Sequence, residues 1–301
     1  MSNGKEYYGG FFWLAVVSFI VPLFVGYKAF EKVSPTTKPV PRPDVSGVCN
    51  EVWDYLLKTY VENGLVDYDG MKKDYLFSEY LRELGGAKPE LLPTDNHRLA
   101  LMCNAYNALV INGVITHKKP PKVNEFAVDG TAFFNLKEHI FAGQTISLND
   151  LENGMIRPTF KEPRIHVALV CAARSCPAIR AEAYTGDRVI EQLQDQSKQF
   201  ANNETYVRFD EGKNELEVSP ILNWYGDDWN ERYPDGGWQR WLTQLVDSAE
   251  LKTNIEKAIR GEGVGISFAT YDWALNSQSK PGESVGGGNA GGFGSGSIPE
   301  E

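Results

Sequence analysis

The stretch RIHVALVCAARSCP, residues 164–177, combines apolar and reactive side chains more densely than any other part of the chain. The segment 164–171 is short, apolar and rich in β-branched residues, which predicts a buried strand. Side chains alternate along a strand, so Arg164 and His166 would share one face and Cys171 would lie on the other.

Beyond this strand the chain turns, and Ser175 predicts the start of a helix with Pro177 in its first turn. Cys176 would also lie in that turn, where unpaired backbone N–H groups and the helix dipole favour an anion. A thiolate there has a lowered pKa, and Arg174 would lower it further. His166 would act as the proton acceptor of a Cys/His nucleophile pair.

Other interpretations of these residues stay open. Cys176 is consistent with inert core packing, because free cysteines are among the most buried side chains. A disulfide between Cys171 and Cys176 is another interpretation. A metal site with His166 and both cysteines is weaker, because alternation separates His166 from Cys171. With four cysteines and no pair of CxxC motifs, the sequence predicts no metal site and no cofactor.

The segment NAYNALVI, residues 104–111, lies within a helix predicted over about 94–116. Asn104 and Asn107 are three residues apart and share one helix face. Amides in an apolar interior are costly unless they are hydrogen-bonded. They therefore either orient a catalytic group or a substrate, which makes Asn104 a candidate catalytic residue, or fix a loop through its backbone.

In SLNDLENGMIRP, residues 147–158, Ser147 and Asp150 have the spacing of a capping box that opens a short helix. Glu152 on this helix is a candidate general base. An ion pair with Arg157, a polar network or a solvated helix face are the alternatives.

The segment SPILNWYGDDW, residues 219–229, holds three aromatic residues beside two aspartates. Such a cluster lines a binding cleft or, more commonly, packs in a core. The candidate binding residues of the chain are Asn107, Arg164, Arg174, Trp224 and Tyr225.

The remaining pattern is rich in helices, and the strands gather late in the chain. Helices are predicted over 48–60, 71–84, 186–201 and 237–248. Hairpins are predicted over 133–146 and 205–219, and a strand near 264–271. This mixture predicts an α+β fold, a single helix-rich globular domain with a small late sheet.

Residues 11–27, FFWLAVVSFIVPLFVGY, are free of charge and reach the lower length limit of a membrane-spanning helix. Aromatic residues at both ends favour an uncleaved single-pass anchor in a lipid bilayer over a signal peptide or a buried helix. The charge bias is too small to assign the side of the membrane. The chain divides into a tail over 1–10, the anchor over 11–27, a proline-rich linker over 28–47, the globular domain over 48–276 and a disordered Gly/Ser-rich tail over 277–301.

The 301 residues carry a formal net charge of −10, and 42% of them are hydrophobic. This composition excludes a wholly disordered chain, a collagen and a multi-span membrane protein. An acidic chain repels phosphate backbones, so no nucleic-acid partner is expected. A substrate or protein partner is not specified by the composition.

Taken in order, these motifs resemble one family, the domain of unknown function 547. The resemblance covers most of residues 50–276 and rests on LALMCNAYNALVI, SLNDLENGMIRP, RIHVALVCAARSCP, SPILNWYGDDW and ISFATYDWALN. It implies export or membrane attachment, and relatives in thioredoxin or glutaredoxin contexts imply redox chemistry by association. The chain departs from the family pattern at Asn153, where histidine is frequent, and at Cys103, where a large apolar residue is usual.

Two functions follow as hypotheses. The first is a thiol-dependent enzyme, of redox or of acyl-transfer and hydrolase type, with Cys176 as nucleophile, His166 as base and Asn104 or Glu152 orienting it. The second is a non-catalytic module that binds a ligand or a protein at a membrane surface.

Overall fold

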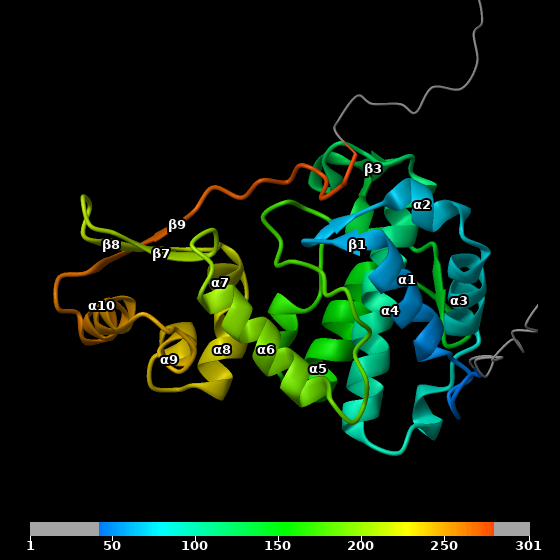
Figure 1. The fold of residues 1–301 in the computed structure, drawn as a ribbon, viewed down its shortest axis with the longest axis horizontal. Coiled ribbons are helices and arrows are strands. Elements are labelled where there is room, and N and C mark those ends of the chain that lie inside the picture. Colours follow the sequence, from blue (N-terminus) through cyan, green and yellow to red (C-terminus); the bar gives the residue numbers. More distant parts are fainter. Residues whose placement is uncertain (1–41, 280–301) are drawn as a thin grey trace, which may run out of the picture. The chain divides into compact units, whose positions relative to one another are not determined.

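In the computed structural model, which describes residues 42–279, the long helix α4 (Asp95–Thr116) is the centre of the first of two cores (Figure 1). Thr94 caps it by accepting the N–H of His97. The predicted helix over 94–116 is therefore confirmed. By length and apolarity α4 could span a membrane, but 78% of its most apolar window is buried, as in the core helix of a domain.

Shorter helices surround α4, and all but the shortest of them bury side chains in this core. They are α1 (Asn50–Tyr60), α2 (Tyr68–Lys73), α3 (Tyr75–Gly85), α5 (Arg157–Phe160) and α6 (Val189–Ala201). Trp53 of α1 stacks on Tyr80 of α3 with ring centroids 5.2 Å apart. The predicted helix over 71–84 is two helices, because Asp74 interrupts it and caps α3 by accepting the N–H of Leu76.

The chain around this helical core also forms three two-stranded hairpins. They are β1 (Val61–Glu62) with β2 (Leu65–Val66), β3 (Ala127–Val128) with β4 (Thr131–Ala132), and β5 (His139–Phe141) with β6 (Gln144–Ile146). The β5–β6 turn is Ala142-Gly143, where both residues have positive φ. This confirms the hairpin predicted within 133–146.

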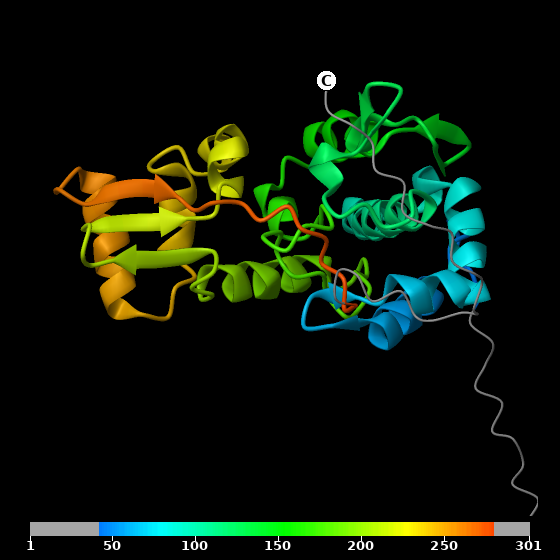
Figure 2. The same ribbon diagram turned by 90° about the horizontal axis from the view of Figure 1, so that it is seen from above.

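A second core lies under a three-stranded sheet (Figure 2). Strand β8 (Glu215–Val218) pairs antiparallel with β7 (Val207–Asp210) and parallel with β9 (Gly265–Phe268). The helices of this core are α7 (Ile221–Trp224), α8 (Gly226–Arg232), α9 (Gly237–Leu242) and α10 (Ala249–Arg260). Helix α10, which is capped by Ser248 and ends at Gly261, was not predicted from the sequence. The described residues thus form the predicted mixed α+β fold with small sheets.

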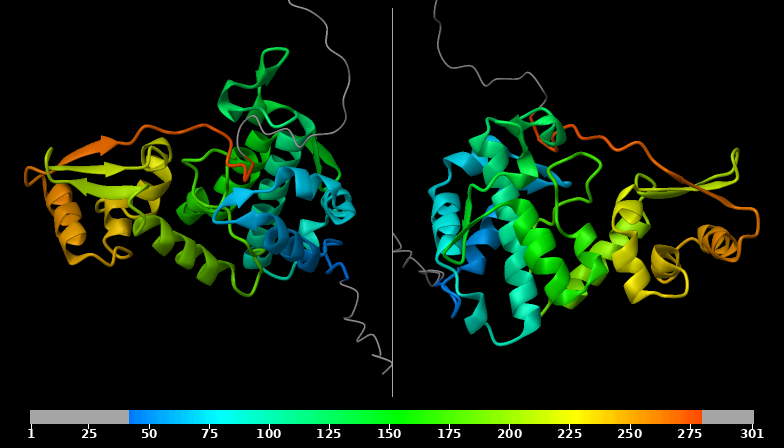
Figure 3. Two further views of the ribbon diagram at one scale, coloured as in Figure 1. Left: turned by 45° about the horizontal axis from the view of Figure 1, so that its top comes forward. Right: turned by 180° about the vertical axis from the view of Figure 1, so that it is seen from behind.

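After β9 the chain returns to the first core, and we call residues 269–279 the return segment (Figures 2 and 3). It runs along the chain near Ala173: the N–H of Arg174 donates to the carbonyl of Ala274, and the N–H of Asn276 donates to the carbonyl of Ala172. The return segment therefore ties the two cores together beside the cysteine-bearing loop.

The strand predicted over 164–171 is wrong. The chain there forms a short 3₁₀ helix, η5 (Pro163–Val167), and then an irregular loop. No strand of the described part pairs with it. Two of its buried backbone groups are instead satisfied by the side chain of Asn107, which accepts the N–H of Val170 and donates to the carbonyl of Ala168.

The helix predicted from Ser175 is also absent, since the chain stays irregular as far as α6. The anchor predicted over 11–27 lies outside the described residues, as do residues 1–10, most of the linker and most of the Gly/Ser-rich tail.

Candidate functional site

A cavity of about 190 Å³ collects most of the motifs singled out from the sequence. Its walls come from α4, from the turn that carries Glu152, from the loop after η5, from α7 and from the return segment. The lining residues are Tyr106, Phe134, Asn149, Glu152, Asn153, His166, Leu169, Cys171, Cys176, Ile221, Trp224, Tyr225, Tyr271 and Trp273.

Two free thiols, Cys171 and Cys176, lie side by side in the lining of this cavity. The backbone N–H of Cys171 donates to Sγ of Cys176 at 3.0 Å, and Sγ of Cys171 lies 3.2 Å from the hydroxyl oxygen of Tyr271. Cys176 is only 5% exposed, whereas Cys171 is partly exposed. The disulfide considered from the sequence is absent in this state.

The thiol with the lowered pKa is Cys171. A hydrogen bond with the Cys176 thiol, and next one with the Tyr271 hydroxyl, lower the pKa of Cys171 against the opposing effect of burial. Burial, and next the neighbouring Cys171, raise the pKa of Cys176 well above its usual value. The predicted activation of Cys176 fails because no helix begins there, so neither free helical N–H groups nor a helix dipole stabilise its thiolate.

His166 lines the same cavity and is held by a carboxylate. Its Nε2 lies 2.7 Å from Oδ2 of Asp228, which also accepts two hydrogen bonds from the guanidinium of Arg157. Hydrogen bonds from His166 and then from Arg157 hold the pKa of Asp228 well below its usual range. The imidazole stacks on Tyr225 with centroids 3.7 Å apart.

Burial lowers the pKa of His166 and favours its neutral form. Because Nε2 faces the carboxylate of Asp228, Nε2 carries the proton and Nδ1 is left as an acceptor. Nδ1 is buried and has no hydrogen-bond partner within residues 42–279. It is therefore a proton acceptor that the fold leaves unused.

Glu152 lies on a wide π-type turn, η4 (Asp150–Ile156), that places its carboxylate in the cavity. The predicted capping box starts this turn: the hydroxyl of Ser147 accepts the N–H of Asp150. Glu152 is 8% exposed and accepts a hydrogen bond of 2.8 Å from Tyr225. The ion pair with Arg157 considered from the sequence is not formed, because Arg157 binds Asp228 instead.

Aromatic rings form the remaining wall. Trp224, which is 48% exposed, lies 5.8 Å from Trp273 and 4.9 Å from Tyr271 between ring centroids. Tyr271 and Trp273 belong to the return segment and were not among the predicted site residues. The aromatic motif ISFATYDWALN was the available signal, but nothing local placed it beside Cys171.

The structure brings five predicted residues to the cavity, namely Glu152, His166, Cys176, Trp224 and Tyr225. Four others do not line it. Asn104 holds both backbone groups of Tyr184, and Asn107 holds the loop before Cys171. Arg164 pairs with Glu162, and Arg174 is exposed.

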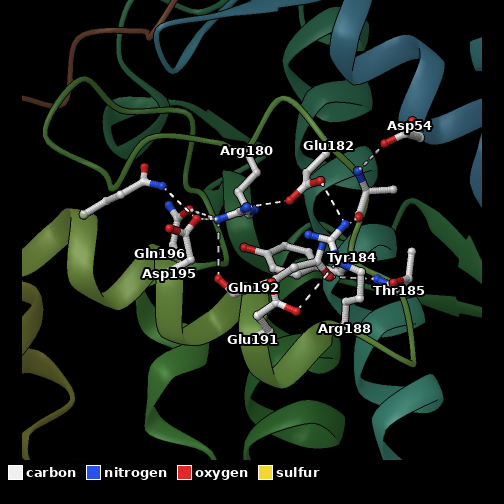
Figure 4. A network of polar contacts seen from close by, with 12 residues as sticks. Asp54, Arg180, Glu182, Tyr184, Thr185, Arg188, Glu191, Gln192, Asp195 and Gln196 are labelled. Atoms are coloured by element: carbon white, nitrogen blue, oxygen red, sulfur yellow. Dashed lines mark hydrogen bonds and ion pairs between the residues drawn. The ribbon is translucent and has the colours of Figure 1, made fainter. Parts of the chain in front are cut away.

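The loop that follows Cys176 is anchored by a polar network around Arg180 (Figure 4). The guanidinium of Arg180 donates to Asp195 of α6 at 2.6 Å and to Glu182 of the loop. Gln192 of α6 donates to the carbonyl of Ala183 at 2.8 Å. These contacts give an irregular segment a defined path.

Comparison with known proteins gives one family match. Residues 90–201 match the family described as "Protein of unknown function, DUF547", so the chain resembles that family and contains a domain of unknown function. The match includes both cysteines of the cavity, His166 and Glu152, and it ends before the three-stranded sheet of the second core. Neither the curated proteins nor the solved structures contained a match.

Proposed function

We propose that this domain is a thiol-dependent enzyme that carries out thiol–disulfide exchange, with Cys171 as the attacking thiol and Cys176 as the resolving thiol. The observation that carries the proposal is the pair of adjacent thiols in the lining of a cavity, of which the partly exposed one has the lowered pKa. A low-pKa, accessible thiol next to a buried partner is typical of cysteines that undergo reversible oxidation. Cys176 thus keeps a part in the chemistry, as the second thiol.

In the proposed reaction the Cys171 thiolate attacks one sulfur of a substrate disulfide. An S–S bond forms between Cys171 and that sulfur, and the other half of the substrate leaves as a thiolate. Cys176 then loses its proton and attacks Sγ of Cys171, which releases the second half as a thiol. The substrate disulfide is reduced to two thiols while the pair is oxidised to a disulfide, and an external thiol reductant restores it.

A base is needed for Cys176, because burial raises the pKa of its thiol. The neutral His166, oriented by Asp228, and the carboxylate of Glu152 are the groups of the cavity able to accept this proton. Tyr271 stabilises the Cys171 thiolate through its hydroxyl group.

The test uses the reduced full chain and dithiodipyridine, a disulfide whose thiol product absorbs light. The wild type should end as an intramolecular disulfide, detected as a mass loss of two hydrogens. Cys176→Ser should stop at a mixed disulfide, and Cys171→Ser should react far more slowly. Cys49→Ser is the matched control, because Cys49 lies at the start of α1, where serine is well tolerated. If Cys171→Ser reacts as fast as the wild type, the proposal is wrong.

The His166–Asp228 pair favours a second candidate, thiol-dependent acyl transfer or hydrolysis with the same nucleophile. The two reactions differ in their need for Cys176. Hydrolysis of an activated thioester that survives in Cys176→Ser but is lost in His166→Gln would favour acyl transfer. If both cysteines are inert, a non-catalytic binding module remains, supported by the half-exposed Trp224.

We also propose that residues 11–27 anchor this domain to a membrane as a single-pass segment. Their uninterrupted apolar character supports the proposal. Full-length protein should stay with membranes after alkaline carbonate extraction, and release into the soluble fraction would contradict it.

A further inference from the structure

Glu152 is a buried carboxylate in the cavity, and no cation balances it. None of the ion pairs within residues 42–279 includes Glu152. The neighbouring guanidinium of Arg157 is occupied by a two-bond contact with Asp228. No lysine or arginine lines the cavity.

Such a carboxylate is incompletely satisfied by the protein alone. The hydroxyl of Tyr225 donates a hydrogen bond to Oε1 of Glu152, and the hydroxyl of Tyr106 also interacts with this carboxylate. Two hydroxyl groups leave part of its roughly four acceptor positions open. A buried charge is costly unless it is paired and hydrogen-bonded. The side chain is more than nine-tenths buried and lines the cavity, so a ligand in the cavity is placed to supply the missing positive charge.

The aromatic wall suits a cation with an apolar stem. The Tyr225 ring is already covered by protein groups, because His166 stacks on it and the guanidinium of Arg157 lies 5.1 Å from its centroid. The half-exposed ring of Trp224 is the wall that remains open to a ligand. Aromatic faces attract ammonium groups, and their rings pack against methylene chains.

We propose that the cavity binds substrates through a protonated primary amine, with the ammonium group on Glu152 and its alkyl stem along Trp224 and Trp273. This inference rests on the proposed function, for which it names the substrate class: a small disulfide, or a disulfide-bearing side chain, that carries an alkylammonium group. The attacked sulfur of the substrate then lies next to Cys171 in the cavity.

The size and charge of the site agree with this class. An apolar cavity of about 150 Å³ holds one benzene molecule, so about 190 Å³ accommodates a four-carbon amine. A carboxylate or phosphate on the substrate would meet Glu152 without any lining cation to bind it. The site therefore selects against anionic disulfides.

The experiment measures binding of n-butylammonium, n-butanol and butyrate to the full chain carrying Cys171→Ser, so that thiol chemistry plays no part. Tryptophan fluorescence reports occupancy through Trp224 and Trp273. We expect n-butylammonium to bind at least about tenfold more tightly than n-butanol, a difference of about 1.4 kcal/mol, and butyrate not to bind. Adding Glu152→Gln should abolish the preference. Asp187→Asn, which removes an exposed charge outside the cavity lining, should preserve it.

Equal binding of n-butanol and n-butylammonium would overturn the inference, as would a preference that survives Glu152→Gln. The comparison of ligands on the parent chain needs no change at Glu152, so it decides the question even if that variant does not fold. The outcome is independent of the thiol reaction. If the chain prefers the ammonium ligand but shows no disulfide exchange, the proposed function is wrong and the ammonium site stands. If it exchanges disulfides but shows no such preference, the proposed function stands and the ammonium site is wrong.

Discussion

Tyr271 and Cys171 are a hundred residues apart in the chain, yet the Tyr271 hydroxyl oxygen lies 3.2 Å from Sγ of Cys171. The return segment makes this contact possible, because it leaves β9 and runs beside the loop at Ala173. The last described stretch of the chain thus completes a site whose thiols and histidine are supplied by the middle of the chain.

Tyr271→Phe should raise the pKa of the Cys171 thiol, because it removes a hydrogen bond that stabilises the thiolate. Alkylation by iodoacetamide at pH 7 should slow by at least about twofold, since the thiolate is the reacting species. The pH dependence of the alkylation rate checks this. An unchanged profile would mean that the hydroxyl does not act on the sulfur.

Asn107→Ala should destabilise the domain by about 2–4 kcal/mol, because it leaves two buried backbone groups, the N–H of Val170 and the carbonyl of Ala168, without partners. It should also slow alkylation of Cys171, whose loop it holds. Asn203→Ala, which loses one exposed hydrogen bond to Thr205, is the control and should cost far less. Urea denaturation measures both, and equal costs would contradict the role given to Asn107.

Asp228→Asn should lower the free energy of unfolding by about 2 kcal/mol or more. The substitution leaves the buried His166 and the guanidinium of Arg157 without their carboxylate. Glu231→Gln is the matched control, because Glu231 forms an exposed ion pair with Lys161 and such pairs contribute about 0–1 kcal/mol. Thermal unfolding compares the two. A cost for Asp228→Asn no larger than that of the control would show that the pair carries little stability.

Stability should fall as the pH drops below about 6.5, the usual pKa of histidine. Burial lowers the pKa of His139 and His166 in the folded state. On acidification the unfolded chain therefore binds protons on these histidines before the folded chain does. The free energy of unfolding falls as the pH drops from the unfolded pKa to the lower folded pKa. Neither ring nitrogen of His139 has a hydrogen-bond partner within residues 42–279.

His139→Leu should therefore weaken the decline in melting temperature between pH 7 and pH 5. His97→Gln, at a partly exposed position, serves as the control and should retain the decline. If both variants follow the wild type, burial of His139 is not a source of the acid sensitivity.

The elements that the sequence predicted well are those defined by neighbours in the chain. Contacts over a few residues define the start of α4 near Thr94, the box of Ser147 and Asp150 and the hairpin within 133–146. The burial of both Asn104 and Asn107 also followed from their shared helix face. The local pattern allowed these asparagines either to orient a catalytic group or to hold a loop, and in the structure both hold loops.

By itself, then, the sequence determined a helix-rich α+β domain, most of its longer helices and the hairpins within 133–146 and 205–219. It also singled out the cysteine-bearing segment 164–177 as the candidate for reactivity. Only the tertiary structure decided the path of 164–177, because an apolar β-branched run forms a strand only if a partner strand satisfies its backbone, and Asn107 takes that place. The tertiary structure also decided which thiol has the lowered pKa, since the pKa of Cys171 depends on Cys176 and on the distant Tyr271. Local spacing in the sequence does not predict that the hydroxyl of Tyr271, a hundred residues further along the chain, contacts the Cys171 thiol.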